Sequence, residues 1–172
     1  MKSIRNIAFS ALLTLGAFST ITYTSCNKDE CKDVVCNNGG TCDENTGNCL
    51  CATGYEGETC SEEVRAKFVK TWTASDKNID DNENLPTYQS VIVKGTAVTE
   101  VSISNFSDDY FEKDIKATVS GTTITIPSQD PDGDLYKVSG TGQYNTADKK
   151  ITWSYTITNP LGATISYSGT WQ

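Results

Sequence analysis

Six cysteines within a stretch of 30 residues constrain this chain more than any other feature of its sequence. They are Cys31, Cys36, Cys42, Cys49, Cys51 and Cys60. The stretch has few large apolar side chains, so it cannot bury enough surface to fold without cross-links. Such density predicts a disulfide framework in an exported protein, and spacing alone leaves about 15 pairings open. Zinc ribbons favour cysteine pairs two to four residues apart, which Cys49-Leu50-Cys51 does not match.

Two glycine-bearing stretches and the intervals between the cysteines resemble those of an EGF-like domain. The stretches are Asn38-Gly39-Gly40-Thr41-Cys42 and the ending from Cys49 to Cys60, which includes Gly54 and Gly57. The resemblance covers residues 31–60. It implies the following disulfide bonds: Cys31–Cys42, Cys36–Cys49 and Cys51–Cys60.

Residues 1–25 have the pattern of a secretory signal peptide. Lys2 and Arg5 give a positively charged start, and an uncharged, mostly apolar stretch runs from Ile7 to Ile21. A permanent membrane-spanning helix needs roughly 20 such residues, more than this stretch supplies. We therefore expect cleavage rather than a membrane-spanning anchor.

The residues that follow the apolar stretch resemble the processing signals of bacterial lipoproteins. Tyr23-Thr24-Ser25-Cys26 resembles a lipobox, and Asn27-Lys28-Asp29-Glu30 resembles a short signal for export to the outer face of the outer membrane. The resemblance implies a lipid on Cys26, with residues 26–30 as a tether. It also implies a protein in the bacterial outer membrane that faces the cell exterior and contacts the membrane through lipid.

Residues 64–172, after a linker at 61–63, show the alternation of apolar and polar side chains that is typical of β-strands. The clearest alternation is at Ile151, Trp153, Tyr155 and Ile157. Eight strands in sequence are predicted, at 64–74, 85–94, 101–103, 115–119, 124–126, 136–144, 151–157 and 165–171. Such a set must bury one face. We therefore predict an all-β protein in which an eight-stranded antiparallel meander, either a barrel or a sandwich, follows the small disulfide-rich module.

Tryptophan and glycine residues on one face favour a strongly curved sheet. Phe68-Val69-Lys70-Thr71-Trp72 and Gly169-Thr170-Trp171 weakly resemble the tryptophan-bearing strands of lipocalin-like barrels. A barrel of that kind could hold a small apolar ligand in a pocket. The candidate lining residues are Trp153, Tyr155, Tyr167 and Trp171. The alternative is that these aromatic residues simply pack the core.

Carboxylates are concentrated on alternate connections of the predicted meander, which emerge at one end of the domain. The connections after the first, third and fifth strands carry Asp76, Asp80, Asp81, Glu83, Asp108, Asp109, Asp130, Asp132 and Asp134. Asp130, Asp132 and Asp134 have the alternating oxygens of a calcium loop, although Leu135 and Thr141 replace its usual glycine and glutamate. These acids are either a cation site or solvated loops that keep the protein soluble.

Composition limits the functions that such a chain can have. It contains no histidine, which removes the commonest general base and metal ligand. Its net charge of −8 argues against nucleic-acid binding. We expect a non-enzymatic binding or interaction protein without a cofactor, whose unknown partner is a protein or a glycan. The alternatives are a carrier of a small apolar ligand and a hydrolase that acts on glycans with paired carboxylates.

Overall fold

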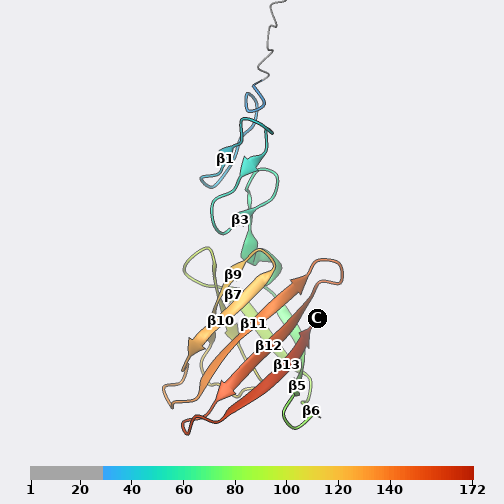
Figure 1. The fold of residues 1–172 in the computed structure, drawn as a ribbon, viewed down its shortest axis with the longest axis vertical. Helices are drawn as coiled ribbons and strands as arrows, with labels where there is room; N and C mark the ends of the chain where they lie inside the picture. Colours follow the sequence, from blue (N-terminus) through green and yellow to red (C-terminus); the bar gives the residue numbers. More distant parts are fainter. Residues whose placement is uncertain (1–28) are drawn as a thin grey trace, which may run out of the picture.

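The computed structural model describes residues 29–172, which form two parts along the long axis of the molecule (Figure 1). A small disulfide-bonded module, residues 31–60, is followed by a β-barrel. Neither part contains an α-helix, and none of the described residues forms a helix that could cross a membrane. The all-β prediction is confirmed for this range.

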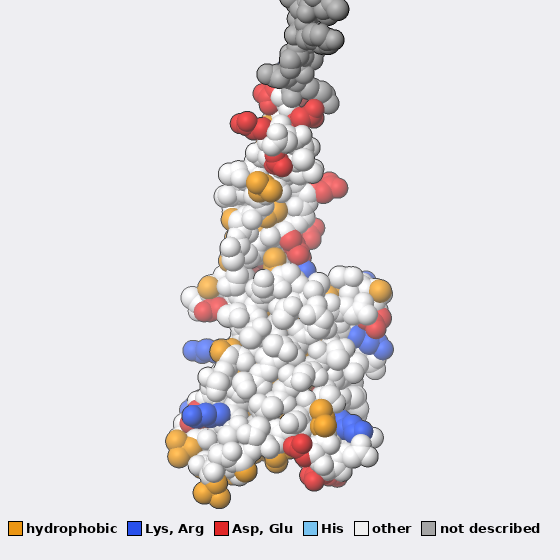
Figure 2. Space-filling model, viewed as in Figure 1, with side chains coloured by type: hydrophobic (Ala, Val, Ile, Leu, Met, Phe, Trp, Pro, Cys, Tyr) orange, Lys and Arg blue, Asp and Glu red, His pale blue; other side chains and the backbone are white. Residues whose placement is uncertain are grey.

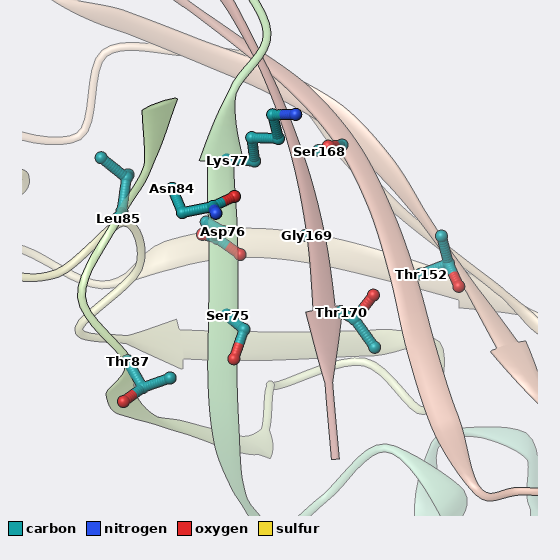
Figure 3. Close-up of a pocket in the computed structure, with 10 residues that line it drawn as sticks. All are labelled: Ser75, Asp76, Lys77, Asn84, Leu85, Thr87, Thr152, Ser168, Gly169 and Thr170. Carbon is teal, nitrogen blue, oxygen red and sulfur yellow. The ribbon is translucent and has the colours of Figure 1, made fainter. Parts of the chain in front are cut away.

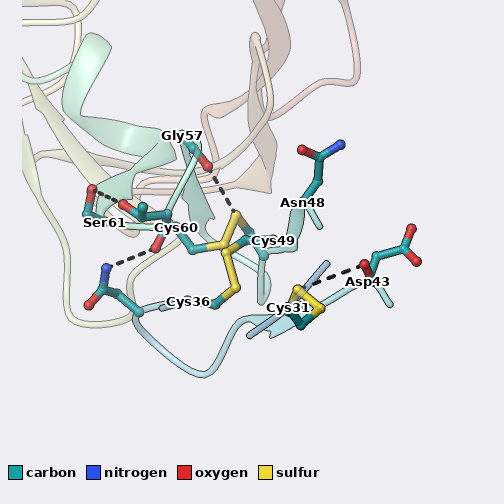
Figure 4. Close-up of a disulfide and its surroundings, with 12 residues drawn as sticks. Cys31, Cys36, Asp43, Asn48, Cys49, Gly57, Cys60 and Ser61 are labelled. Carbon is teal, nitrogen blue, oxygen red and sulfur yellow. Dashed lines mark hydrogen bonds between the residues drawn. A yellow bond between two sulfur atoms is a disulfide. The ribbon is translucent and has the colours of Figure 1, made fainter. Parts of the chain in front are cut away.

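Two small hairpins and three disulfide bonds form the disulfide module. Strand β1 (Thr41–Cys42) pairs with β2 (Cys49–Leu50), and β3 (Tyr55–Glu56) pairs with β4 (Glu62–Glu63). The bonds are Cys31–Cys42, Cys36–Cys49 and Cys51–Cys60, the set that the EGF-like resemblance implies (Figure 4). Because β4 pairs with β3, the segment expected to be a linker is part of the last hairpin of this module.

A short 3-10 helix, η1 (Val64–Lys67), lies where the first barrel strand was expected to begin. Val64 and Phe68 are buried four residues apart, and the Phe68 ring packs edge-on against Tyr144 at 5.6 Å between centroids. The Trp72 indole N–H donates a hydrogen bond to the Phe68 carbonyl over 2.8 Å. A turn therefore suits this segment better than a strand, because it places Val64 and Phe68 against the end of the barrel.

Eight long strands form the barrel, each antiparallel to its neighbours. They are β5 (Thr71–Asn78), β7 (Tyr88–Lys94), β8 (Glu100–Ser104), β9 (Ile115–Ser120), β10 (Thr123–Gln129), β11 (Lys137–Asn145), β12 (Lys150–Thr158) and β13 (Thr164–Trp171). Strand β13 pairs with β5, from Tyr167 opposite Asn78 to Trp171 opposite Ala74, which closes the sheet. The short β6 (Glu83–Asn84) adds to the end of β5. The predicted meander is confirmed, and it is a closed barrel.

Glycines on the inner face make room for aromatic side chains on the neighbouring strand. Gly142 lies opposite Trp153, and a Cβ on Gly142 would lie 2.9 Å from Trp153 Cδ2. A Cβ on Gly140 would overlap the Tyr155 side chain on the same strand pair. These close approaches allow β11 and β12 to curve tightly around the aromatic core.

The core consists of large aromatic rings that contact one another across the barrel. Trp153 and Trp171 lie 5.1 Å apart between ring centroids. Phe106 packs against both Trp153, at 5.5 Å, and Tyr155, at 4.8 Å. Phe106 belongs to the connection between β8 and β9 rather than to a strand, so a loop completes the core from one end.

The connections between strands divide into two sets at opposite ends of the barrel. The near end, beside the disulfide module, has the connections 95–99, 121–122 and 146–149. The other end, which we call the distal rim, consists of four connections, most of them longer: 79–87, 105–114, 130–136 and 159–163. Figure 1 shows the disulfide module over the near end, with the distal rim pointing away from it.

Candidate functional site

Exposed apolar side chains gather at the distal rim. Of the eight large hydrophobic residues that are exposed in residues 29–172, five lie on or beside it: Ile79, Tyr110, Leu135, Leu161 and Ile165. The Leu161 side chain is 93% exposed and that of Leu135 is 61% exposed. Figure 2 shows hydrophobic side chains along the lower edge of the barrel, beside acidic ones. The distal rim therefore carries most of the large apolar side chains that are exposed in the described residues.

The distal rim is also strongly acidic. Its connections carry ten carboxylates and one lysine, Lys113. Of the nine carboxylates expected there, eight are in these connections, but Asp76 is not. Asp76 lies within β5 and is only 3% exposed. The correction follows from strand alternation, since Asp76 shares the inner face of β5 with Trp72 and Ala74.

The structure does not assemble Asp130, Asp132 and Asp134 as a calcium site. Asp130 accepts hydrogen bonds from three backbone amides of its own loop, and Asp134 accepts one from Tyr136. Asp132 instead accepts bonds from the backbone amides of residues 112 and 113. In residues 29–172, no group of three or more cysteines or acids is arranged to hold a metal ion. The alternating acids therefore cap turns, because their oxygens already bind separate backbone amides.

Asp76 is the centre of a hydrogen-bond network inside the barrel. Its Oδ2 accepts bonds from the hydroxyls of Tyr88, over 2.5 Å, and Tyr155, over 2.7 Å. Its Oδ1 accepts a bond from the Trp171 indole N–H over 3.1 Å. Ser107 joins the network because its backbone N–H donates to Tyr88 and its hydroxyl bonds with Tyr155. The network connects four strands and the 105–114 connection across the closure of the barrel.

Burial and the neighbouring carboxylate together keep the two tyrosines of this network protonated. Burial raises the pKa of Tyr88 above its ordinary range, and the charge of Asp76 raises it further. The pKa of Tyr155 is raised by the same two causes. Gly169 faces Asp76 in the pairing of β13 with β5, and a Cβ there would overlap Asp76 Oδ1. Glycine at 169 is therefore required for the carboxylate to occupy this position.

The four residues considered as a ligand pocket are brought together on the inner face of β12 and β13. Trp153 contacts Trp171, and Tyr155 stacks on Tyr167 with ring centroids 4.9 Å apart. With Phe106 among them, these rings fill the space between the strands at this level. The Trp153 indole N–H is buried without a hydrogen-bond partner in the described part of the chain.

A shallow groove of about 470 Å³ lies on the outer wall where β5 meets β13 (Figure 3). Hydroxyl groups predominate in its lining, which includes Ser75, Thr152 and Thr170, with Lys77 at one side. Asp76 contributes to the lining, but its carboxylate is held by the interior network. The groove can therefore form hydrogen bonds but does not present a pair of carboxylates.

A junction of charged side chains fixes the near end of the barrel to the disulfide module. Arg65 is buried, and its Nη1 donates to the backbone carbonyls of Gly95, Ala97 and Glu100 over 2.7 to 3.0 Å. Its Nε bonds to Glu63 over 2.9 Å. One side chain thus holds the hairpin between β7 and β8 in place beneath the module.

Further contacts strengthen this junction. Lys67 forms an ion pair with Glu56 of the disulfide module at 2.7 Å and donates to the Gly121 carbonyl of the barrel. The hydrogen bond from Arg65, supported by Lys94, lowers the pKa of Glu63 to about 2. Gly54 approaches Val98 so closely that a Cβ on it would overlap that side chain. The two parts therefore meet through a defined contact rather than a free linker.

Sequence reasoning missed the interior network, the junction and the role of Phe106. Alternation within β5 is the signal that could have placed Asp76 inside the barrel. For Arg65 the sequence offers no such signal, because its carbonyl partners lie 30 to 35 residues away. Cys26, the expected lipidation site, lies outside the described residues.

Comparison with known proteins gives a match for the first part of the chain. A search of curated proteins found no match. A family model described as "EGF-like domain" matches residues 26–60. This range contains all three disulfide bonds. The disulfide module is therefore similar to EGF-like domains in both its sequence and its cysteine pairing.

Proposed function

We propose that this protein is a non-enzymatic interaction protein that presents the distal rim of its barrel to a partner. The observation that carries the proposal is the concentration of exposed apolar side chains at the end of the barrel opposite the disulfide module. Apolar side chains left in water do not stabilise a barrel whose core is complete without them. A binding role accounts for their position.

In this proposal, the disulfide module is a spacer between a membrane and the barrel. Residues 1–25 serve as a signal peptide, and lipid on Cys26 anchors the chain to the bacterial outer membrane, facing the cell exterior. The contacts of Arg65 and Lys67 support a spacer of fixed direction, because they join the module to the near end of the barrel. The distal rim is then the part of the molecule farthest from the anchor.

Two properties of the barrel favour this role over those of a carrier or a hydrolase. Aromatic rings pack against one another inside the barrel at the level where a small apolar ligand would sit. Asp76 is a single interior carboxylate that already accepts three hydrogen bonds. Glycosidases instead use two carboxylates that flank the bond they cleave.

The location is tested by labelling intact cells with a maleimide that does not cross membranes. We expect Leu161→Cys to be labelled and the matched variant Ala117→Cys, at a buried position, to remain unlabelled. Changing Cys26 to serine should release the protein from the membrane fraction. Labelling of Leu161→Cys only after cell lysis would overturn the outward orientation.

The interaction role is tested by placing a photo-crosslinking amino acid at Leu161 on the distal rim, or at Ala147 on the near end. Irradiation of intact cells should give a discrete crosslinked product from position 161 and not from position 147. Identical products from both positions, or no product from position 161, would contradict a binding role of the rim.

A further inference from the structure

Three tyrosines lie together at the mouth of the barrel on the distal rim. Tyr110 is 44% exposed, and its ring packs edge-on against Tyr136 at 6.0 Å between centroids. Tyr167 is buried, stacks on Tyr155 and interacts electrostatically with Tyr110. We call Tyr110, Tyr136 and Tyr167 the tyrosine cluster. Aromatic rings with accessible faces bind cations through the negative charge of those faces.

The surroundings of the tyrosine cluster are negative. Burial raises the pKa of Tyr110, and Tyr136, Tyr167 and Asp134 raise it further. Burial also raises the pKa of Tyr167, with a contribution from Asp80 and Asp81. Carboxylates on two rim connections therefore act on members of the cluster, Asp134 on Tyr110 and the pair Asp80 and Asp81 on Tyr167. A positive charge placed there would interact favourably with both the rings and the carboxylates.

Apolar side chains flank this negative mouth. Leu135 is next to Tyr136 in the sequence, Ile165 is two residues from Tyr167, and Leu161 protrudes from the connection between β12 and β13. A partner that binds here must therefore match a negative centre and an apolar border. Small inorganic cations satisfy only the first requirement, and neutral apolar ligands satisfy only the second.

We infer that the distal rim docks a cationic protein segment, whose arginine or lysine side chain sits against the tyrosine cluster while neighbouring apolar side chains cover Leu135 and Leu161. The inference rests on the proposed function and specifies the chemistry of the partner. Charge complementarity selects this occupant, since the rim connections carry ten carboxylates and one lysine. The same charge repels a second copy of the rim, an anionic lipid surface and nucleic acid.

Local backbone conformation allows the rim to be changed without damage to the fold. Asp108 and Asp109 have φ values of +56° and +59°, and Leu135 has a φ of +74°. Asparagine adopts positive φ readily, so Asp108→Asn with Asp109→Asn removes charge and Leu135→Asn removes an apolar side chain with the backbone preserved. Leu161→Ser changes a side chain that is almost fully exposed.

The test uses a displayed library of random twelve-residue peptides, selected on the whole protein and depleted on the variant with all four of these substitutions. Peptides that bind only the unmodified rim should be enriched in arginine or lysine together with apolar residues. Their dissociation constants are then measured by fluorescence anisotropy. We expect binding to weaken roughly three- to tenfold in Tyr110→Ala, and similarly when sodium chloride rises from about 0.1 to 0.5 M.

Matched controls lie on the disulfide module, away from the rim. Glu44→Gln with Glu58→Gln removes the same charge as the two aspartate changes, and Val35→Ser with Leu50→Ser removes exposed apolar side chains. Neither pair should alter the affinity. Melting temperatures of all variants confirm that each is folded.

Enrichment of acidic or uncharged peptides, or equal binding by the rim variants and the disulfide-module controls, would overturn the inference. Rim-dependent binding of phosphatidylcholine vesicles or of neutral oligosaccharides in place of cationic peptides would also overturn it. If position 161 still gave a discrete crosslinked product in intact cells, only the partner chemistry would be wrong. Without that product, the proposed function itself would fail.

Discussion

The two ends of the barrel are built from connections between antiparallel strands, yet they differ in how they use their side chains. At the near end, Arg65 and Lys67 donate to backbone carbonyls, and Val64 and Phe68 are buried. At the distal rim, five large apolar side chains remain exposed. The near end thus satisfies its polar groups and buries its apolar ones, while the rim leaves apolar surface in water.

Backbone conformation shows the same difference. Nine residues other than glycine have positive φ in the described range, and six of them are in the rim connections. They are Asn82, Asn105, Ser107, Asp108, Asp109 and Leu135. Positive φ in a bulky residue such as Leu135 costs about 1 kcal/mol or more. Positive φ is therefore concentrated in the rim connections, where most of these residues are Asn, Asp or Ser and Leu135 is the bulky exception.

The largest expected effect on stability comes from a rim side chain that packs among the core tryptophans. Phe106→Ala should reduce the free energy of unfolding by about 3–5 kcal/mol, because it leaves a cavity among Trp153, Tyr155 and Trp171. Urea titration followed by tryptophan fluorescence measures the change. Phe68→Ala at the near end should have a similar cost. A loss below about 1 kcal/mol for Phe106→Ala would show that this connection does not complete the core.

The junction at the near end gives the next largest effect. Arg65→Met keeps much of the side-chain volume but removes the charged donor that three carbonyls share, of which those of Ala97 and Glu100 keep a bond from a backbone amide, so we expect a loss of about 1–3 kcal/mol. Residual dipolar couplings should also show that the disulfide module no longer keeps one orientation relative to the barrel. The exposed Lys32→Met serves as the charge control. Unchanged couplings in Arg65→Met would contradict a junction held by this side chain.

At the rim, we expect one substitution to increase the free energy of unfolding by a smaller amount. Leu135→Gly should stabilise the protein by about 0.5–1 kcal/mol, because glycine adopts a φ of +74° without steric cost. The control is Leu161→Gly, because residue 161 does not have a positive φ. This variant should not be more stable than the unmodified protein. Thermal unfolding of both variants measures the difference. If Leu135→Gly were destabilised instead, the rim would contribute to stability and its contrast with the near end would be lost.

The smallest effect is a pH dependence at the junction. Because the pKa of Glu63 is lowered to about 2, its stabilising contribution is present above the ordinary value of 4.5 and is lost as pH falls through about 2. The melting temperatures of the unmodified protein and Glu63→Gln should therefore differ at pH 7 and converge near pH 2. Glu58→Gln controls for net charge. A difference that stayed constant across this range would exclude Glu63 as its source.

The sequence predicted much of the architecture because the relevant signals are local. Alternating apolar residues such as Ile151 and Trp153 indicated strands, and the resemblance of residues 31–60 implied the disulfide pairs. The positions of the rim connections followed from antiparallel order alone, since alternate turns of a meander emerge at the same end. Tyr110, Leu135 and Leu161 were not singled out, because single exposed apolar residues in loops have no distinctive pattern.

By itself, the sequence determined the disulfide module, the eight strands and the end of the barrel that carries the acidic connections. Closure by β13 and β5, the interior position of Asp76, the insertion of Phe106 and the contacts of Arg65 were decided only by the tertiary structure. The physical reason is the separation along the sequence of the residues that interact. Strand alternation and cysteine spacing act between residues close in the sequence, whereas Asp76 bonds with Tyr155 and Trp171, 79 and 95 residues away, which only the closed barrel brings within reach.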